Sequence, residues 1–316
     1  MMSPFATVGP GLDPAKFRDP ERTAKGQMRA VVAPTGLTTL WFNTGTLCNL
    51  ACQTCYIESS PRNDALVYLG LDEVRGFLDE IASDRLPTRQ IGFTGGEPFM
   101  NRDLPAMLAL CLDRGFEVLV LTNAMRPLRR HEDALLALPY RDRLTFRVSL
   151  DHYTQAVHEA ERGLRSWAPV MDGLQWLAGS GFQVAVAGRL LPGETEHVAR
   201  AGYASLFETL GVCIDAEDRA GLVLFPEMDA GRDVPEISDI CWTILNVAPA
   251  SIMCASSRMV VKRRGEPSSR VAACTLLPYD PRFDLGATLA EAAVPVSLNH
   301  PHCARFCVLG GVSCAA

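Results

Sequence analysis

The sequence lacks any uninterrupted apolar run of the roughly 18 residues that a membrane-spanning helix needs. The start of the chain, Met1 to Asp19, also lacks the charged and apolar regions of a secretory signal peptide. We therefore expect a cytoplasmic protein without a membrane partner.

A concentrated basic surface is also missing. The net charge is -6, and the basic residues are scattered apart from short groups such as Arg129-Arg130 and Lys262-Arg263-Arg264. This distribution argues against a nucleic-acid partner and favours a small, local substrate. Hydrophobic residues make up 48% of the chain and charged residues only 21%, so a large core is expected and disorder is not.

Cysteine, in contrast, is abundant, with 11 residues. The cytoplasm keeps thiols reduced, so clustered cysteines in such a chain bind metal more often than they form disulfides. Cys111 and Cys213 stand apart in or beside helical patterns, and we expect both to be core residues.

Short apolar runs alternate with helical periods from Leu37 onward, a pattern typical of parallel βα units. The expected strands are Thr39–Asn43, Gln90–Phe93, Val118–Leu121, Thr145–Ser149, Gln183–Ala187 and Leu222–Phe225. The expected helices are Leu71–Ser83, Leu104–Arg114, Glu132–Leu138, Val170–Leu177 and His197–Leu210. This order predicts an α/β fold, either an open doubly wound sheet or a partial barrel, because periodicity alone does not separate them.

Three segments are expected. Residues 1–36 have no sustained period and predict an irregular N-terminal arm, residues 37–230 carry the alternation, and residues 231–316 form a small cysteine-rich extension.

A cysteine triplet follows the first expected strand. Cys48, Cys52 and Cys55 have Cx3Cx2C spacing on a loop at the carboxyl end of a strand, where parallel folds place active sites. A fully ligated 4Fe-4S cluster takes four thiolates, so three leave one iron open. A structural zinc site is the alternative, but it normally needs a fourth ligand, and the sequence shows no Cys or His nearby.

This triplet resembles the motif of the radical S-adenosylmethionine (SAM) superfamily, in which the open iron of a 4Fe-4S cluster chelates SAM. Gly95-Gly96-Glu97-Pro98, directly after the second expected strand, is similar to the GGEP element of that family. The resemblance implies a partial (β/α)6 barrel, catalytic cysteines at the triplet, binding of the methionyl amino group of SAM by residues 95–98, and cleavage of SAM to a 5'-deoxyadenosyl radical.

Weaker matches lie further along the chain. Leu121-Thr122-Asn123 resembles the TNG element of the family and Ser149-Leu150-Asp151 its SLD element, which implies that Asn123 lies near the cofactor and Ser149 near the SAM ribose. His158–Gly163 resembles the HDxxRG segment. Arg189 at the fifth strand end is a candidate partner for the SAM carboxylate.

The sequence departs from the family before the third cysteine, where Thr54 replaces the usual aromatic residue near the adenine and Tyr56 follows instead. Tyr56 is therefore the aromatic candidate for contact with the cofactor.

The C-terminal cysteines resemble the twitch or SPASM extension of radical SAM enzymes, which implies a second, auxiliary 4Fe-4S cluster. The candidate ligands are Cys254 and Cys274 with two of Cys303, Cys307 and Cys314, and a structural zinc is the alternative. Cys241 is open as a ligand or a buried thiol. We expect His300 and His302 to be surface groups or neighbours of the ligands rather than ligands.

The predicted function is hydrogen abstraction from a small-molecule substrate, leading to a net oxidation or a rearrangement, with a reducing donor such as flavodoxin or ferredoxin. Peptide maturation and non-catalytic electron transfer are the alternatives. Candidates facing the substrate are His152, Tyr153 and Glu227.

Overall fold

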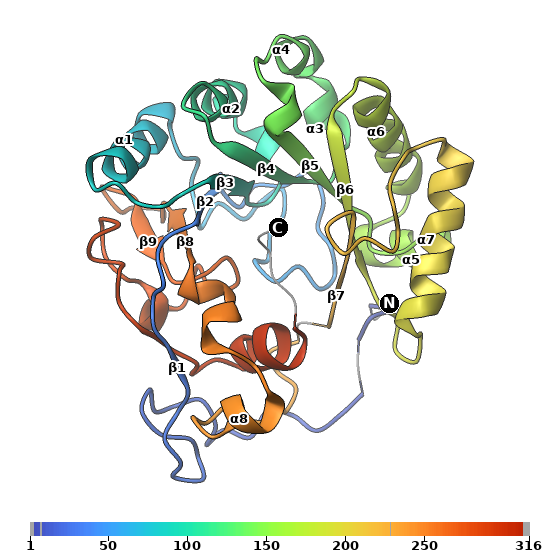
Figure 1. Ribbon diagram of the computed structural model, residues 1–316. Helices are drawn as coiled ribbons and strands as arrows, with labels where there is room; N and C mark the ends of the chain where they lie inside the picture. The colour runs from blue at the N-terminus through green and yellow to red at the C-terminus, as the bar shows by residue number, and fades with distance from the viewer. Residues whose placement is uncertain (1–2, 7, 228, 312–316) are drawn as a thin grey trace.

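The computed structural model describes residues 3–6, 8–227 and 229–311. Its centre is a curved parallel sheet with helices along its outer side (Figure 1). Six strands follow one another in chain order: β2 (Thr39–Asn43), β3 (Gln90–Thr94), β4 (Glu117–Thr122), β5 (Leu144–Ser149), β6 (Gln183–Arg189) and β7 (Leu222–Phe225). Each is hydrogen-bonded in parallel to the next. The predicted partial barrel is confirmed, and the open, doubly wound alternative is set aside by the continuous curvature.

The helices that connect these strands are α1 (Leu71–Ser83), α2 (Leu104–Asp113), α3 (Arg126–Arg129), α4 (Glu132–Leu136), α5 (Gln155–Arg162), α6 (Trp167–Gly179) and α7 (Glu196–Leu210). Capping residues at both ends explain where α7 begins and stops. The Thr195 hydroxyl accepts a hydrogen bond from the Val198 amide at 3.3 Å, which caps the first turn. Gly211 then ends the helix in the left-handed conformation, at φ 67°.

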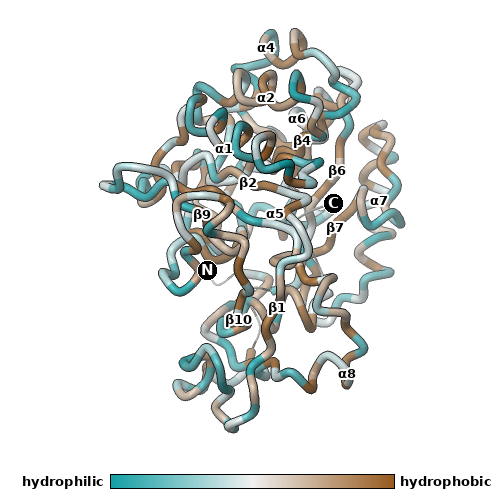
Figure 2. The backbone as a smooth tube through the Cα atoms, turned by 60° about the vertical axis from the view of Figure 1, so that its left-hand side comes forward, coloured by the Kyte–Doolittle hydropathy of each residue, from teal (hydrophilic) through white to brown (hydrophobic). Residues whose placement is uncertain are grey.

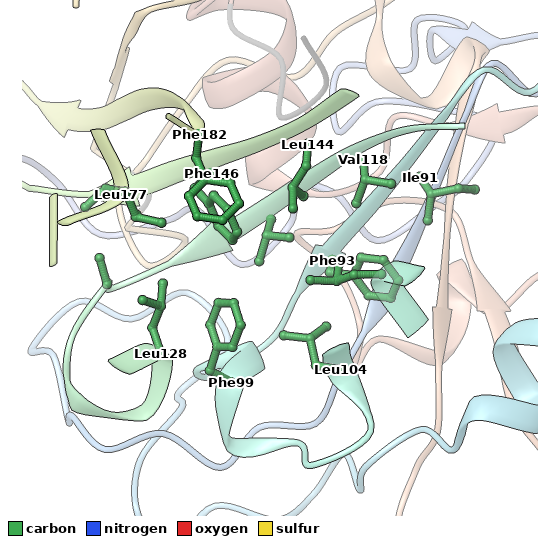
Figure 3. Close-up of a cluster of buried hydrophobic side chains, with 14 of the residues drawn as sticks. Ile91, Phe93, Phe99, Leu104, Val118, Leu128, Leu144, Phe146, Leu177 and Phe182 are labelled. Atoms are coloured by element: carbon green, nitrogen blue, oxygen red, sulfur yellow. The ribbon is translucent and has the colours of Figure 1, made fainter. Parts of the chain in front are cut away.

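The main apolar core lies between the strands and the outer helices. Figure 3 shows Ile91 and Phe93 of β3 and Phe146 of β5 projecting from the sheet toward Phe99 and Leu104. These side chains are nearly inaccessible to solvent, and each contributes roughly 1.5–3 kcal/mol of transfer free energy. Figure 2 shows the same contrast along the chain, with hydrophobic strands such as β4, β6 and β7 inside more mixed helices.

A second core lies on the inner face of the sheet and joins it to the C-terminal segment. Trp41 of β2 and Leu119 of β4 are buried there together with Met259. A Cβ on Gly92 would lie 2.3 Å from the Trp41 ring, so a glycine on β3 gives the indole its space.

The sheet continues beyond residue 230, where we predicted a boundary. β8 (Ser257–Val261) pairs in parallel with β2, with Thr39 opposite Ser257, and β9 (Arg270–Ala272) pairs antiparallel with β8. In the described residues the order is β7-β6-β5-β4-β3-β2-β8-β9. The sequence reading missed β8 because the strand is short and lies among turn residues. The division into three segments therefore stays a prediction. The sheet itself continues across the boundary predicted near residue 230, because β8 pairs with β2.

The extension otherwise consists of short elements. They are α8 (Cys241–Leu245), η3 (Pro249–Ser251), η4 (Met253–Ala255), η5 (Pro281–Phe283), β10 (Val296–Ser297) and the π-helical turn η6 (Cys303–Leu309). The N-terminal arm is irregular over most of its described length, but β1 (Val31–Val32) pairs antiparallel with β10. A buried ion pair of 2.6 Å between Arg29 and Glu236 also holds the arm against the extension.

None of the helices in the described ranges is long and apolar enough to cross a membrane.

Candidate active site

A cleft opens at the carboxyl ends of the parallel strands, where the sequence places its motifs. It encloses about 1100 Å³ of space outside the protein atoms, including its open mouth. The predicted site residues that line it are Cys48, Cys52, Cys55, Tyr56, Gly95, Gly96, Asn123, Ser149 and Arg189. The fold therefore brings together residues that are up to 141 positions apart in the chain.

The cysteine loop connects β2 to α1 and arrives in the cleft with three free thiols. The Leu50 amide donates to the Cys48 sulfur at 3.4 Å, and the Ser59 amide donates to the Cys55 sulfur at 3.3 Å. Amide donors of this kind stabilise thiolates. Three thiols at one cleft, with no fourth cysteine and no histidine among the described residues that line it, fit a 4Fe-4S cluster with one open iron.

Burial makes these thiols hard to ionise without metal. It raises the pKa of Cys48 to about 12 and that of Cys52 to about 11, while the positive charge of Arg162 acts in the opposite direction on both. Binding of iron must therefore displace protons from these sulfurs.

No three His, Cys, Asp or Glu side chains within the described ranges are arranged to hold a single metal ion. Zinc binds thiolates at about 2.3 Å and so draws its ligands tightly together. A single zinc ion therefore needs a tighter arrangement of ligands than the described residues show.

Gly95 and Gly96 seat the cysteine loop on the end of β3. Gly95 has φ 144°, and a Cβ there would lie 2.5 Å from the carbonyl oxygen of Gly45. A Cβ on Gly96 would lie 2.3 Å from the carbonyl oxygen of Leu47. The sequence predicted close approach to a ligand, and the structure shows that the loop itself also requires both glycines.

Glu97 and Pro98 do not line the cleft; both are buried beside it. The Glu97 carboxylate accepts hydrogen bonds from the Phe99 amide, the Thr122 hydroxyl and the Asn123 amide, at 3.2, 2.8 and 2.8 Å. Burial raises its pKa to about 7, although these hydrogen bonds favour the ionised form. Glu97 thus joins the end of β3 to the end of β4 and orients the turn that carries Asn123.

Asn123 lies beside the first cysteine, as expected of a residue near the cofactor. Its side-chain amide donates to Asn49 at 2.9 Å and approaches the Cys48 sulfur at 3.9 Å.

The sequence reading missed the contribution of α5, whose last residues lie against the cysteine loop. Arg162 makes two hydrogen bonds to Asp151, at 2.7 and 3.2 Å, and both residues line the cleft. The Glu161 carboxylate accepts from the amide and hydroxyl of Thr54, at 2.9 and 2.7 Å. The signal was present in the SLD and HDxxRG resemblances, but neither indicated which residues would pair.

Arg189 lies at the end of β6 with 11% of its side chain exposed, so it is not a solvated loop residue. It donates to the Thr54 hydroxyl at 2.7 Å and pairs with Glu227 at 2.5 Å. Glu227, a predicted substrate contact, does not itself line the cleft, but it forms an ion pair with Arg189, which does.

Two other expectations about the site were wrong. His152 and Tyr153 turn away from the cleft, and the Tyr153 hydroxyl donates to Glu194 at 2.9 Å while its ring packs on Tyr203. Cys111 is buried as predicted, but Cys213 is exposed, because it follows the end of α7 and its neighbour Val212 takes the inward position.

The four described candidate ligands of the extension meet at a second, largely apolar cavity, which encloses about 290 Å³ of space outside the protein atoms when its opening to solvent is included. Cys254 comes from η4, Cys274 from the turn after β9, and Cys303 and Cys307 from η6. Burial raises the pKa of Cys254 to about 11. Cys314 lies outside the described residues, and Cys241 is a partly buried thiol 3.4 Å from the Ser238 hydroxyl, away from this cavity.

His300 and His302 do not line the cysteine cavity. His302 is buried and His300 is partly buried, and burial lowers the pKa of His300 to about 3 and that of His302 to about 4. Both imidazoles are thus neutral near pH 7, next to the first cysteine of η6.

Comparisons with known proteins agree with this geometry. The family model described as the radical SAM superfamily matches residues 42–201, which covers β2 to the first turns of α7.

Two curated relatives each match less than half of this chain. The antilisterial bacteriocin subtilosin biosynthesis protein AlbA of Bacillus subtilis is 32% identical over 141 residues, which are 44% of this chain and 30% of AlbA. The mycofactocin maturase MftC of Mycobacterium tuberculosis is 30% identical over 135 residues, which are 43% of this chain and 33% of MftC. The matched stretch thus spans about a third of the length of either relative.

Among solved structures, Streptococcus suis SuiB bound to S-adenosylmethionine superposes with a TM-score of 0.58 at 10% identity, over 80% of this chain and 64% of SuiB. SuiB bound to its precursor peptide SuiA gives a TM-score of 0.57 at 11% identity, over 80% and 63%. At this identity the likeness shows a shared fold.

Proposed function

Because this chain belongs to the radical SAM superfamily, whose members use a 4Fe-4S cluster and SAM, we propose that Cys48, Cys52 and Cys55 bind that cluster and that the cleft beside them binds SAM. When bound, these groups supply a 5'-deoxyadenosyl radical that abstracts a hydrogen atom from the substrate. The observation that carries the proposal is the meeting of the three thiols with Gly95 and Gly96 at one cleft.

The residues of the chain then have separate roles. Gly95 and Gly96 seat the cysteine loop, and Asn123 and Ser149 line the wall available to SAM. Tyr56 is the aromatic side chain of the cysteine loop that lines the cleft, which supports the prediction that it contacts the adenine. The hydrogen bonds to Asp151 fix the Arg162 guanidinium near two of the thiols, where its charge favours their ionised forms. The cleft walls limit the water that reaches the reacting atoms.

A second cluster at the extension is the next part of the proposal. Cys254, Cys274, Cys303 and Cys307 supply four thiolates around one cavity, which is the full ligand set of a 4Fe-4S cluster. Cys314 is not needed for that set. Such a cluster can accept an electron from the substrate radical and make the net reaction an oxidation.

The substrate belongs to one of two classes. The acidic chain without concentrated basic surface is compatible with a small molecule. Peptide maturation is supported equally well, because a maturase and a bacteriocin biosynthesis protein are similar to part of this chain, and SuiB of the same fold is solved with a precursor peptide. In either case a flavodoxin or ferredoxin is the proposed electron donor.

Anaerobic reconstitution tests both clusters. We expect about eight irons per chain in the wild type and about four in a Cys48/Cys52/Cys55 triple alanine variant. We expect about four also in a Cys254/Cys274/Cys303/Cys307 quadruple alanine variant. The exposed Cys213→Ala variant is the control and should keep the wild-type iron content.

SAM cleavage under strong reductant completes the test. 5'-Deoxyadenosine should form in the wild type and in Cys213→Ala but not in the triple variant. Absence of this product in the iron-loaded wild type would contradict the proposed activity and favour a non-catalytic electron-transfer protein. Deuterium transfer into 5'-deoxyadenosine from labelled candidate peptides or small molecules then identifies the substrate class.

A further inference from the structure

The described start of the N-terminal arm, Ser3–Ala6, lies against residues of the cleft wall, whereas Phe17 further along the arm packs on the extension. Phe5 is only 1% exposed, although most neighbouring residues of the arm are accessible to solvent. The Ser3 hydroxyl donates a hydrogen bond of 2.5 Å to Glu161, across 158 positions in sequence. The segment is therefore held by a residue that lies far from it in the sequence and that lines the cleft.

Phe5 covers one face of the Arg189 guanidinium. The guanidinium carbon lies 4.1 Å from the ring centroid, a short distance for a cation–π contact. Arg189 lines the cleft and Phe5 does not, so the ring supports the guanidinium from outside the cleft. With the face covered, the edges of Arg189 are directed to the Thr54 hydroxyl and to Glu227.

Glu161 receives the second contact from the segment and divides its two carboxylate oxygens between two parts of the chain. One oxygen accepts from Ser3, and the other accepts from the amide and hydroxyl of Thr54. Arg189 approaches the Thr54 side of the same carboxylate at 3.4 Å. Ser3 and Phe5 thus hold the two residues that bind Thr54.

Thr54 lies between Cys52 and Cys55, so its position determines how the second half of the cysteine loop meets the cleft. The loop has further support there, because the Gln53 amide donates to the Glu161 carbonyl at 3.1 Å. Glu161 and Arg189 therefore lie between the Ser3–Ala6 segment and the cysteine loop.

We propose that Ser3 and Phe5 are positioning residues that hold Glu161 and Arg189 against Thr54 and so set the geometry of the cysteine loop for SAM binding. The inference rests on the proposed function, because it assigns the segment a role at that same site. It differs from a role in folding alone, which would require only that Phe5 fill apolar space.

The arm provides a matched control. Phe17 is also buried, at 3% exposure, and also lies near an arginine, with Arg29 at 5.6 Å from its ring centroid. Phe17 packs in the second core with the extension, and it does not line the cleft. Loss of its ring should lower stability without moving Thr54.

The experiment titrates SAM into the anaerobically reconstituted, reduced protein and follows the change in the electron paramagnetic resonance spectrum of the cluster. We compare the wild type with Phe5→Ala, Phe5→Leu, Ser3→Ala and Phe17→Ala, and measure iron content and thermal unfolding for each. Phe5→Leu keeps an apolar side chain while it removes the ring face, which separates positioning of Arg189 from simple filling of space.

We expect Phe5→Ala and Phe5→Leu each to raise the SAM concentration at half-change by about tenfold, as loss of a desolvated cation–π contact implies. Ser3→Ala should raise it several-fold, and Phe17→Ala should leave it unchanged. Iron content should remain near that of the wild type in all four.

Wild-type SAM affinity in Phe5→Leu would overturn the inference. A loss of SAM affinity in Phe17→Ala as large as that in the Phe5 variants would overturn it as well. A wild-type spectrum that does not respond to SAM would instead overturn the proposed function, and the inference with it. Because Ser3→Ala removes a single, partly buried hydroxyl, it tests the positioning role even where a Phe5 variant unfolds.

Discussion

Arg162 shows how single charges act at this site. Its side chain is 15% exposed and is fixed by two hydrogen bonds to Asp151, so the guanidinium cannot turn toward solvent without losing both. Its charge favours the thiolate forms of Cys48 and Cys52, which burial disfavours. Arg162 therefore assists the loss of protons that metal binding requires, whereas the Asp151 carboxylate opposes it by raising the pKa of Cys52.

Replacement of Arg162 by glutamine should make the metal-free thiols less reactive. The thiolate is the nucleophile, so a rise of one pKa unit lowers its population about tenfold below the pKa. We expect alkylation by iodoacetamide at pH 9, followed by mass spectrometry, to slow at both thiols and more strongly at Cys52 than at Cys48, because Arg162 is the largest charge effect on Cys52 and a minor one on Cys48. The exposed Arg165→Gln variant is the control, and an equal rate in both variants would contradict the assignment.

His158 gives the protein a dependence on pH. Burial, and then the charge of Arg162, lower its pKa from 6.5 to about 4. His158 therefore binds a proton below about pH 6.5 in the unfolded chain but only below about pH 4 in the folded chain. The stability that this difference contributes is fully present above pH 6.5 and is lost as the pH falls toward 4, by roughly 3 kcal/mol in total.

A His158→Gln variant should lose less stability on acidification than the wild type. Guanidinium unfolding of the metal-free protein at pH 7.0 and pH 4.5 measures the two free-energy differences. The exposed His197→Gln variant should behave as the wild type. Equal losses in His158→Gln and the wild type would show that another group carries the dependence.

At the scale of elements, the site depends on how closely α6 packs on the turn after β4. A Cβ on Gly173 would lie 1.7 Å from the carbonyl oxygen of Ala124, and Ala124 itself has a positive φ of 54°. The next residue back, Asn123, lines the cleft beside Cys48. A small residue in a helix on the outer side of the sheet thus sets the position of a cleft residue.

Gly173→Ala should destabilise the protein and weaken SAM binding together, since the turn must move to admit the methyl group. Alanine is otherwise favoured over glycine in a helix by about 1 kcal/mol, so propensity alone predicts the opposite sign. Gly76→Ala in α1, where a Cβ would have no neighbour within 4 Å, is the control and should stabilise. Thermal unfolding and SAM titration measure both effects, and stabilisation by Gly173→Ala would contradict this packing.

At the scale of the whole molecule, barrel and extension share one sheet and one core. β8 covers the edge of β2, and the second core combines Trp41 and Leu119 of the barrel with Met259 of the extension. Structures that share strands and buried side chains in this way unfold together. Figure 1 shows the extension filling the side of the barrel that its own strands leave open.

A chain that ends at residue 230 should therefore not fold as a stable barrel. Loss of β8 exposes the β2 edge, which favours aggregation, and it uncovers Trp41. We expect the truncated protein to lack a cooperative thermal transition in circular dichroism, whereas the full chain should show a single one. A truncated protein that melts at the same temperature as the full chain would establish an independent barrel domain.

The sequence by itself determined the features that are local along the chain. The six strands of the barrel lie within two residues of their predicted bounds, because each is a short apolar run between turn residues. The Cx3Cx2C and GGEP elements could also be recognised from the sequence, because each lies within one short stretch of the chain. Five of the expected helices were found near their predicted positions, and the extra short ones had too few turns to give a period.

Only the tertiary structure decided what lies between distant segments. Pairing of β8 with β2 joins residues more than two hundred positions apart, and no local pattern encodes which edge a short strand covers. The outward turn of Tyr153, the exposure of Cys213 and the contact of Ser3 with Glu161 likewise depend on which parts of the folded chain pack around each side chain. Sequence spacing supplies the chemistry of this protein, whereas long-range packing decides which of those groups share one cleft.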